Sequence, residues 1–328
     1  MKRILAAMLA AAFALSMTAC SGGQSSSGSA PAASSDGGSA PAATEEYIIG
    51  AAFPLTGKGA TAGKTEVIGV TMAVNEINAA GGINGVPIKL LVEDTASDPK
   101  QAGDAVRKLA SENALCIIGP HYSNEAEVTF PIGNEIGIVQ VATACSKPGL
   151  SEANRPFAYR NVTTEDKISD KVLKAWVEAY DIKTVAIITD VKDSVSKSCG
   201  EEVFPGLFEA LDVEVLTLDD PITYQTGDVD FSSQITKIKY MNPDGIALGS
   251  LAADAMNIID EARKQGLEQM FVGAAPLLEG ELEKKGGENA AGTFAGSVFW
   301  LHDPDPKVQE FVKNYREIAP TLYSGISA

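Results

Sequence analysis

Short apolar runs alternate with helical patterns along most of this chain. The first run, Tyr47–Pro54, leads into a loop rich in glycine and threonine. After it, apolar residues recur at a spacing of three and four, at Val67, Val70, Val74 and Ile77. This spacing predicts a helix that buries these four side chains on one face. Gly81 and Gly82 end that helix, because glycine adopts the left-handed backbone at little cost, and a strand over 86–92 follows.

A strand, a helix and a second strand form a βαβ unit, which predicts a parallel sheet with its loops at the carboxyl edge. The alternation continues along the chain. We predict further helices over 99–113, 125–135, 167–180, 201–211, 231–241 and 253–265. We predict further strands over 115–119, 138–142, 184–189, 213–218, 245–249 and 270–273.

Two extended runs without a helical period, 156–162 and 292–300, interrupt this alternation. We interpret them as chain crossings between two lobes, where a hinge rotation could be absorbed. The first lobe would comprise 46–157 plus 300–328, and the second 158–298. The predicted fold class is therefore α/β, with two Rossmann-like lobes, each built on a parallel sheet and joined by hinge crossings.

The first 45 residues have a different composition. Lys2 and Arg3 precede an apolar run over 4–15, and small residues then lead to Cys20. The run is shorter than the roughly twenty residues that span a bilayer, so we predict a cleaved signal peptide over 1–20. Residues 21–45 are mostly Ser, Gly, Ala and Pro, which is typical of a flexible tether. A flexible tether is useful only if the residues before it are anchored.

The residues before Cys20 resemble a bacterial lipobox, although Met17 stands where leucine is commoner. We therefore predict that Cys20 carries lipid and holds the protein at a membrane outside the cytoplasm. This surface could be periplasmic or the outer face of a cytoplasmic membrane. The alternative is an ordinary secretory signal that is cleaved elsewhere.

Charge and composition exclude several classes of function. The net charge of −17 argues against a nucleic-acid partner, which requires a basic surface. Two histidines exclude a histidine-rich metal site, and no cofactor motif is predicted. Beyond Cys20, the cysteines Cys116, Cys145 and Cys199 have irregular spacing, which gives no disulfide framework and no metal motif. Cys116 lies in an apolar run and is predicted to be a core residue.

The region 46–328 resembles the extracytoplasmic binding proteins for branched-chain amino acids, which serve ABC transporters and have the type I periplasmic-binding-protein fold. The most specific stretch begins IIGPHYSNE and ends ATACSKPGL. In that family, a serine after the Gly-Pro turn and a later loop of small residues hold the ligand carboxylate. Ser123 matches the first position, and Ala144 (through its backbone) and Ser146 match the second. Ser123 would also cap a helix that begins near Asn124, whose free N–H groups favour an anion.

The same resemblance implies further ligand-lining positions. His121, Tyr122 and Cys145 flank the two carboxylate segments. Ala62, Ser194 and approximately Leu251 stand where the family's amino-acid binders have aromatic residues. The resemblance also implies a monomer that is no enzyme, captures a small carboxylate-bearing solute and delivers it to permease subunits in the membrane.

One family position argues against a simple α-amino acid as the ligand. Members that bind α-amino acids place an acidic residue where this chain has Ala275. An ammonium buried without its partner costs roughly 3–5 kcal/mol. We therefore predict an organic or aromatic acid or a derivatised amino acid, unless Glu279, Asp193 or Asp254 supplies the acid.

Other functions have weaker support in the sequence. The segment 62–65, AGKT, resembles part of a P-loop, but Lys58 stands where that pattern requires glycine. The folded part lacks a G-x-S-x-G elbow, and His121 beside Ser123 is slender support for a secreted hydrolase. An envelope interaction or sensory lipoprotein with the same fold is the remaining alternative. Because the family pattern normally continues beyond the final PTLYSGISA, we also expect the C-terminal part to be truncated.

Overall fold

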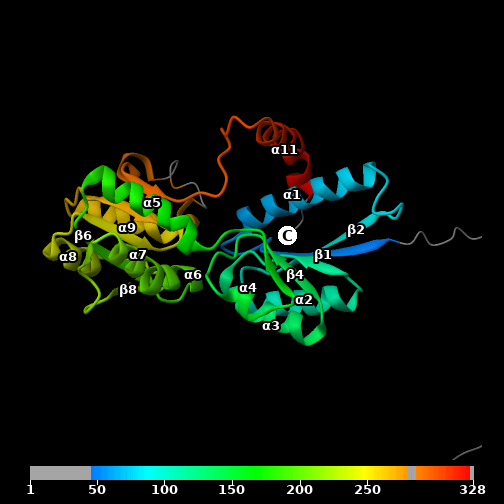
Figure 1. Cartoon of the computed structure of the whole chain (residues 1–328), viewed down its shortest axis with the longest axis horizontal. Helices are drawn as coiled ribbons and strands as arrows, with labels where there is room; N and C mark the ends of the chain where they lie inside the picture. The colour runs from blue at the N-terminus through cyan, green and yellow to red at the C-terminus, as the bar shows by residue number, and fades with distance from the viewer. Residues whose placement is uncertain (1–45, 279–281, 283–285, 326–328) are drawn as a thin grey trace, which may run out of the picture. The chain divides into compact units, whose positions relative to one another are not determined.

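The computed structural model describes residues 46–278, 282 and 286–325, and its strands and helices alternate largely as predicted (Figure 1). Its strands form two parallel sheets, one of five strands and one of six. This confirms the predicted α/β class with two sheets. The predicted signal peptide, Cys20 and the tether lie outside the described residues. Within those residues, no helix combines the length and apolar composition needed to cross a membrane.

The first sheet has the strand order β2-β1-β3-β4-β5. Its strands are β1 (Tyr47–Phe53), β2 (Ile88–Asp94), β3 (Cys116–Ile118), β4 (Val139–Ala142) and β5 (Ala158–Arg160). The helices that follow these strands are α1 (Ala60–Ala79), α2 (Pro99–Ser111), α3 (Ser123–Ile136) and α4 (Leu150–Ala153). The last helix, α11 (Pro306–Gly325), returns to this lobe and packs on α1, where the Tyr315 hydroxyl donates to the Thr65 carbonyl at 3.3 Å.

The second sheet has the order β11-β10-β9-β6-β7, and β8 also pairs with β6. Its strands are β6 (Thr184–Asp190), β7 (Glu214–Val215), β8 (Ile222–Tyr224), β9 (Gly245–Gly249), β10 (Met270–Gly273) and β11 (Thr293–Ala295). Its α-helices are α5 (Glu165–Tyr180), α6 (Ser194–Ser198), α7 (Phe204–Ala210), α8 (Ser232–Met241) and α9 (Ala252–Lys264). A π-helical turn (Cys199–Val203) joins α6 to α7, and two 3-10 turns cover Ala275–Leu278 and Gly287–Ala290.

Local sequence explains where several elements end. Gly81 and Gly82 both have positive φ after α1, as predicted. The Asp98 side chain caps α2 by accepting from the Gln101 N–H at 2.9 Å. The predicted inner face of α2 is confirmed, because all four of its residues are buried: Ala102, Ala105, Val106 and Leu109.

The predicted buried face of α1 is wrong in part. Val67 is buried, but Ile77 is 39% exposed, and Ile68 and Met72 are buried in its place. Near the start of α1, Gly63 lies so close to the preceding loop that an added Cβ would be 2.1 Å from the Pro54 carbonyl oxygen. Val70 is partly buried and packs on the cluster of Ala51, Phe53, Leu55 and Val67, so the prediction fails at Ile77 and not along the whole face.

Three other predictions need correction. Cys116 is half-buried rather than in the core, because it lies at the start of a three-residue strand. The helix predicted from residue 201 begins at Ser194 and passes through the π-helical turn. β5 pairs in parallel with β4, so the first sheet continues to Arg160, beyond the predicted lobe boundary at 157. The remaining lobe boundaries stay predictions.

Candidate functional site

All ten predicted ligand positions follow the carboxyl end of a strand, where ligands bind in open α/β sheets. Ala62 lies in the first turn of α1, after β1. Two groups follow β3 and β4: His121, Tyr122 and Ser123, and Ala144, Cys145 and Ser146. In the second lobe, Ser194 follows β6, Leu251 follows β9 and Ala275 follows β10.

Ser123 is buried, but it does not cap a helix as predicted. The helix α3 begins at Ser123 itself, and Tyr122 is its N-cap residue. The reason is Glu125, whose carboxylate accepts from the Tyr122 N–H at 3.2 Å and so closes the helix start one residue earlier. The Ser123 hydroxyl instead accepts from the backbone N–H of Lys147 at 3.3 Å. Ser123 therefore contacts the loop that follows β4.

Arg160 on β5 holds this loop, which we call the anion loop and define as residues 143–149. Its guanidinium donates to the Cys145 carbonyl at 3.1 Å and to the Lys147 carbonyl at 2.8 Å. Its Nε donates to the Ser151 hydroxyl at 2.8 Å, just beyond the loop. Two carbonyl groups of the loop thus face Arg160, which leaves the N–H groups of 144–146 for a ligand.

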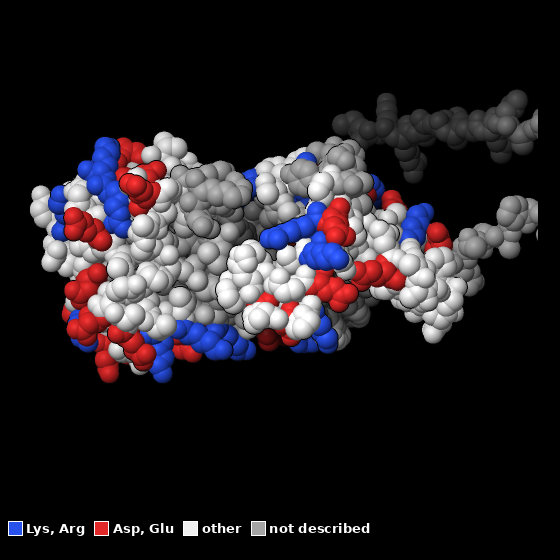
Figure 2. Space-filling view, turned by 90° about the horizontal axis from the view of Figure 1, so that it is seen from above, with Lys and Arg blue, Asp and Glu red and all other residues white. Residues whose placement is uncertain are grey.

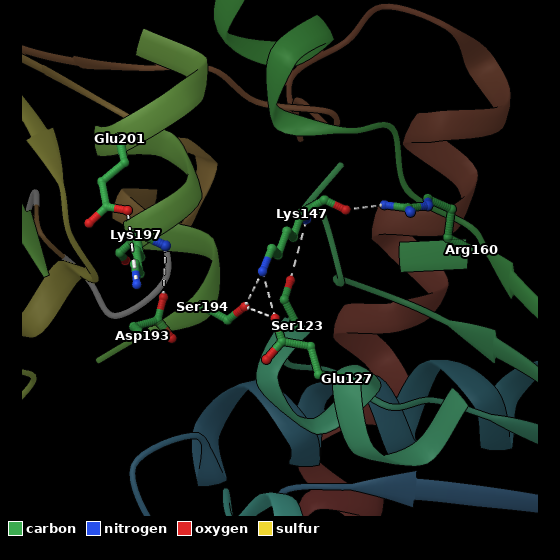
Figure 3. A network of polar contacts seen from close by, with 9 residues as sticks. Ser123, Glu127, Lys147, Arg160, Asp193, Ser194, Lys197 and Glu201 are labelled. Atoms are coloured by element: carbon green, nitrogen blue, oxygen red, sulfur yellow. Dashed lines mark hydrogen bonds and ion pairs between the residues drawn. The ribbon is translucent and has the colours of Figure 1, made fainter. Parts of the chain in front are cut away.

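Lys147 connects the anion loop to the second lobe (Figure 3). Its ammonium donates to Glu127 Oε1 on α3 at 2.6 Å and to the Ser194 hydroxyl on α6 at 3.1 Å. Ser194 also donates to Glu127 Oε1. The two predicted site residues Ser123 and Ser194 are therefore linked through one lysine.

Acidic groups lie beside Ser194. Asp193 is buried and caps α6 by accepting from the Ser196 N–H at 3.0 Å, and burial raises the pKa of its carboxyl. The buried Asp190 carboxylate, at the end of β6, accepts from the N–H groups of Lys192, Asp193 and Thr226. These bonds fix the start of α6 and hence the position of Ser194.

Ala275 has a buried acid beside it that the sequence did not predict. The Ala275 N–H donates to Glu165 Oε2 at 3.3 Å, and Glu165 is the first residue of α5. The N–H of Glu165 in turn donates to the Ser146 carbonyl at 2.9 Å. A carboxylate from another element therefore lies next to the position where the acid was expected to be missing.

His121 contacts α1. It is buried, and its Nδ1 lies 3.0 Å from Glu66 Oε2. Its ring lies edge-on to the Tyr122 ring, and the Lys58 ammonium lies 5.3 Å from the centre of that ring. These contacts place His121 and Tyr122 beside the loop after β1.

Hydrogen bonds among the described residues join Ser123 to Ser194 through Lys147, and Ser146 to Ala275 through Glu165. Neither of these two groups includes Ala62 or Leu251. Sequence reasoning missed Lys147, Glu127, Arg160 and Glu165. Lys147 carried a usable signal, because it directly follows Ser146 and is the basic residue of the anion loop.

Chemistry at the cysteines is limited by burial. Cys116, Cys145 and Cys199 are free thiols, and burial raises the pKa of each. Such thiols are poor nucleophiles and poor metal ligands. Within the described ranges, no group of three or more His, Cys, Asp or Glu residues is arranged to hold a metal ion. Figure 2 shows acidic side chains interspersed with basic ones on the face it presents.

Comparison with known proteins identifies a family. Residues 46–328 match the family described as "Periplasmic binding protein". The Leu/Ile/Val-binding protein homolog 2 of Brucella abortus is 30% identical over 276 residues, which cover 83% of this chain and 72% of that protein.

Solved structures share the fold. One is the branched-chain amino acid transporter substrate binding protein LivJ from Streptococcus pneumoniae in complex with isoleucine. It has a TM-score of 0.72 and 22% identity, and the match covers 86% of this chain and 82% of that one. Another is a solute binding protein of an ABC transporter from Rhodopseudomonas palustris in complex with 3,4-dihydroxy benzoic acid. It has a TM-score of 0.69 and 19% identity, with 85% and 78% covered.

Proposed function

The chain belongs to the periplasmic binding protein family, and we propose that it is the substrate-binding lipoprotein of an ABC importer. It captures a small carboxylate-bearing solute between its two lobes and delivers it to permease subunits in the membrane. It has no catalytic activity of its own. Cys20 carries the lipid that holds it at the membrane surface, outside the cytoplasm.

One observation carries this proposal. Ser123, the anion loop and Ser194 meet through Lys147, although they follow three different strands in two sheets. Backbone N–H groups at the start of α3 are available for an anion, because the first N–H groups of a helix have no partner within it. A carboxylate bound there accepts hydrogen bonds from Ser123 and from the N–H groups of 144–146.

Ala275 decides the ligand class within this proposal. Without an acidic side chain at that position, the ligand keeps its carboxylate and lacks an α-ammonium. The Rhodopseudomonas palustris protein binds an aromatic acid of this kind in the same fold. The competing class, branched-chain α-amino acids, would need Glu165 as the partner of the ammonium.

Thermal denaturation of the protein with matched probes tests the ligand class. We expect 3,4-dihydroxybenzoate to raise the melting temperature, its methyl ester to have no effect and isoleucine to have little. A ligand at a hundred times its Kd stabilises the folded state by about 2.7 kcal/mol, which is readily detected. A larger shift with isoleucine, abolished by Glu165→Gln, would replace the organic acid with an amino acid. If no organic acid or amino acid raises the melting temperature, an envelope interaction lipoprotein becomes the better description of this protein.

Cell fractionation tests the anchor. We expect Cys20→Ser to release the protein from the membrane fraction into the soluble extracytoplasmic fraction. A Cys116→Ser variant is the matched control and stays with the membrane. Retention of the Cys20→Ser variant would contradict the lipoprotein assignment and leave the binding function untouched.

A further inference from the structure

Three side chains near the proposed site connect the two lobes. Lys147 and Glu127 belong to the lobe of the first sheet and Ser194 to the lobe of the second. Each of the three contacts both of the others, as Figure 3 shows. We call this group the clasp.

The clasp is held on both sides by groups that do not depend on it. The Lys147 backbone N–H donates to the Ser123 hydroxyl, and its carbonyl accepts from Arg160. These two bonds hold the main chain at Lys147 in place. On the other lobe, Ser194 is the first residue of α6, directly after the buried cap residue Asp193. A shift of the anion loop therefore moves the lysine relative to Ser194.

We propose that the clasp holds the lobes together and couples their closure to occupancy of the anion site, with Lys147 as the positioning residue. This inference rests on the proposed solute-binding function. A carboxylate that binds Ser123 and the anion loop fixes Lys147 where it reaches Ser194. Closure through the clasp in turn presents the loop in its binding position.

Exposure sets the strength of the clasp. The side chains of Lys147 and Glu127 are 28% and 38% accessible, so salt and water reach the ion pair. Two partly exposed hydrogen bonds, from Lys147 to Ser194 and from Ser194 to Glu127, cross between the lobes and favour the closed form by about threefold to thirtyfold. Such a bias allows the lobes to open for ligand exchange.

Ser194→Ala is the most selective test, because it cuts the contact to the second lobe and leaves the Lys147–Glu127 pair in place. Small-angle scattering is measured on the full, ligand-free chain in low and in high salt. We expect the variant to have a larger radius of gyration than the wild type in low salt. We expect high salt to expand the wild type and to leave Ser194→Ala unchanged.

Further variants separate the clasp from general damage. Lys147→Met should expand the chain less than Ser194→Ala does, because the Ser194–Glu127 bond remains, and Lys147→Arg should restore the wild-type radius. Lys197→Met is the matched control, since Lys197 also lies on α6 but pairs at 3.9 Å with Glu201 of its own lobe. It should scatter as the wild type does. Circular dichroism verifies that each variant is folded.

Binding of 3,4-dihydroxybenzoate supplies the second readout. We expect Ser194→Ala to weaken its Kd by about threefold to thirtyfold through faster dissociation. Equal radii for wild type and Ser194→Ala at both salt concentrations would overturn the clasp. Because the scattering measurement needs no ligand, failure of the probe to bind would count against the proposed function and not against the clasp.

Discussion

Replacing Arg160 with methionine tests how the anion loop is held. Methionine fills a similar volume along the apolar part of the side chain but removes all donors. The variant loses the bonds to the carbonyl groups of Cys145 and Lys147 and to the Ser151 hydroxyl, at 3.1, 2.8 and 2.8 Å. The Arg160 side chain is only 9% accessible, so water reaches these acceptors poorly once the guanidinium is gone.

The expected loss follows from these three bonds, because the fourth bond of the guanidinium, to the exposed Glu152 carboxylate at 3.0 Å, contributes little. A hydrogen bond to a charged group contributes about 1.5–3 kcal/mol, but the acceptors are only partly buried. Taking about 1 kcal/mol for each bond, we expect the free energy of unfolding to fall by about 3 kcal/mol. With a urea dependence of about 2–3 kcal/mol per molar, the midpoint moves down by about 1 M.

The assay is urea unfolding followed by far-UV circular dichroism, together with amide hydrogen exchange of 144–151. Exchange in this segment should accelerate more than exchange in the second sheet. Arg155→Met is the matched control, because the exposed Arg155 stacks over the Tyr159 ring at 4.5 Å and does not hold the loop. If Arg160→Met unfolds at the urea concentration of the wild type, with the same exchange in 144–151, Arg160 does not hold the anion loop.

Three other measurements address separate parts of the molecule. Ser123→Ala should weaken binding of a carboxylate probe by about tenfold to a hundredfold, as measured by calorimetry, and equal affinity would remove Ser123 from the anion site. Gly200→Ala should lower the unfolding midpoint, because its Cβ would lie 2.1 Å from Thr189 Oγ1; Gly206→Ala, with open space around it, should not lower it. Burial raises the pKa of the Asp94 carboxyl, but hydrogen bonds from Thr56, Ala96 and Leu55 outweigh it and lower the pKa below 3.8. The ionised Asp94 carboxylate therefore stabilises the fold above that value, and this stabilisation is lost as the pH falls through the folded-state pKa. Asp94→Asn should flatten the fall in the free energy of unfolding in acid, and the same fall as in the wild type would refute this.

Much of the fold follows from local sequence. β1, β9 and β10 have the predicted bounds or nearly so, because each is a short apolar run bounded by polar or turn residues. The ends of α1 and α2 follow from Gly81 and Asp98, which act within one turn of the chain. These signals require no knowledge of distant neighbours.

Errors arose where distant contacts decide the outcome. On α1, Ile68 and Met72 are buried beside Val67, whereas Ile77 is exposed. Strand β8, a run of three residues, is too short to show a period and depends on pairing with β6. These features have no local pattern to read.

The candidate site also has a part that the sequence could predict and a part that it could not. Its loops could be located from the strand ends, and Ser123 and Ser146 from a family resemblance. The contacts of Lys147 with Glu127 and Ser194 join residues 20 and 47 positions apart, and those of Glu165 with Ala275 join residues 110 apart. Side chains at such separations meet only through the packing of whole elements.

The packing of α11 on α1 has a consequence for the order of events during synthesis. The Tyr315–Thr65 contact spans 250 residues, so the outer surface of α1 stays uncovered until nearly the whole described chain has emerged. The second sheet draws its strands from a continuous stretch, Thr184 to Ala295, and can assemble earlier. A nascent chain would therefore complete its second sheet before it covers α1, the first helix to emerge.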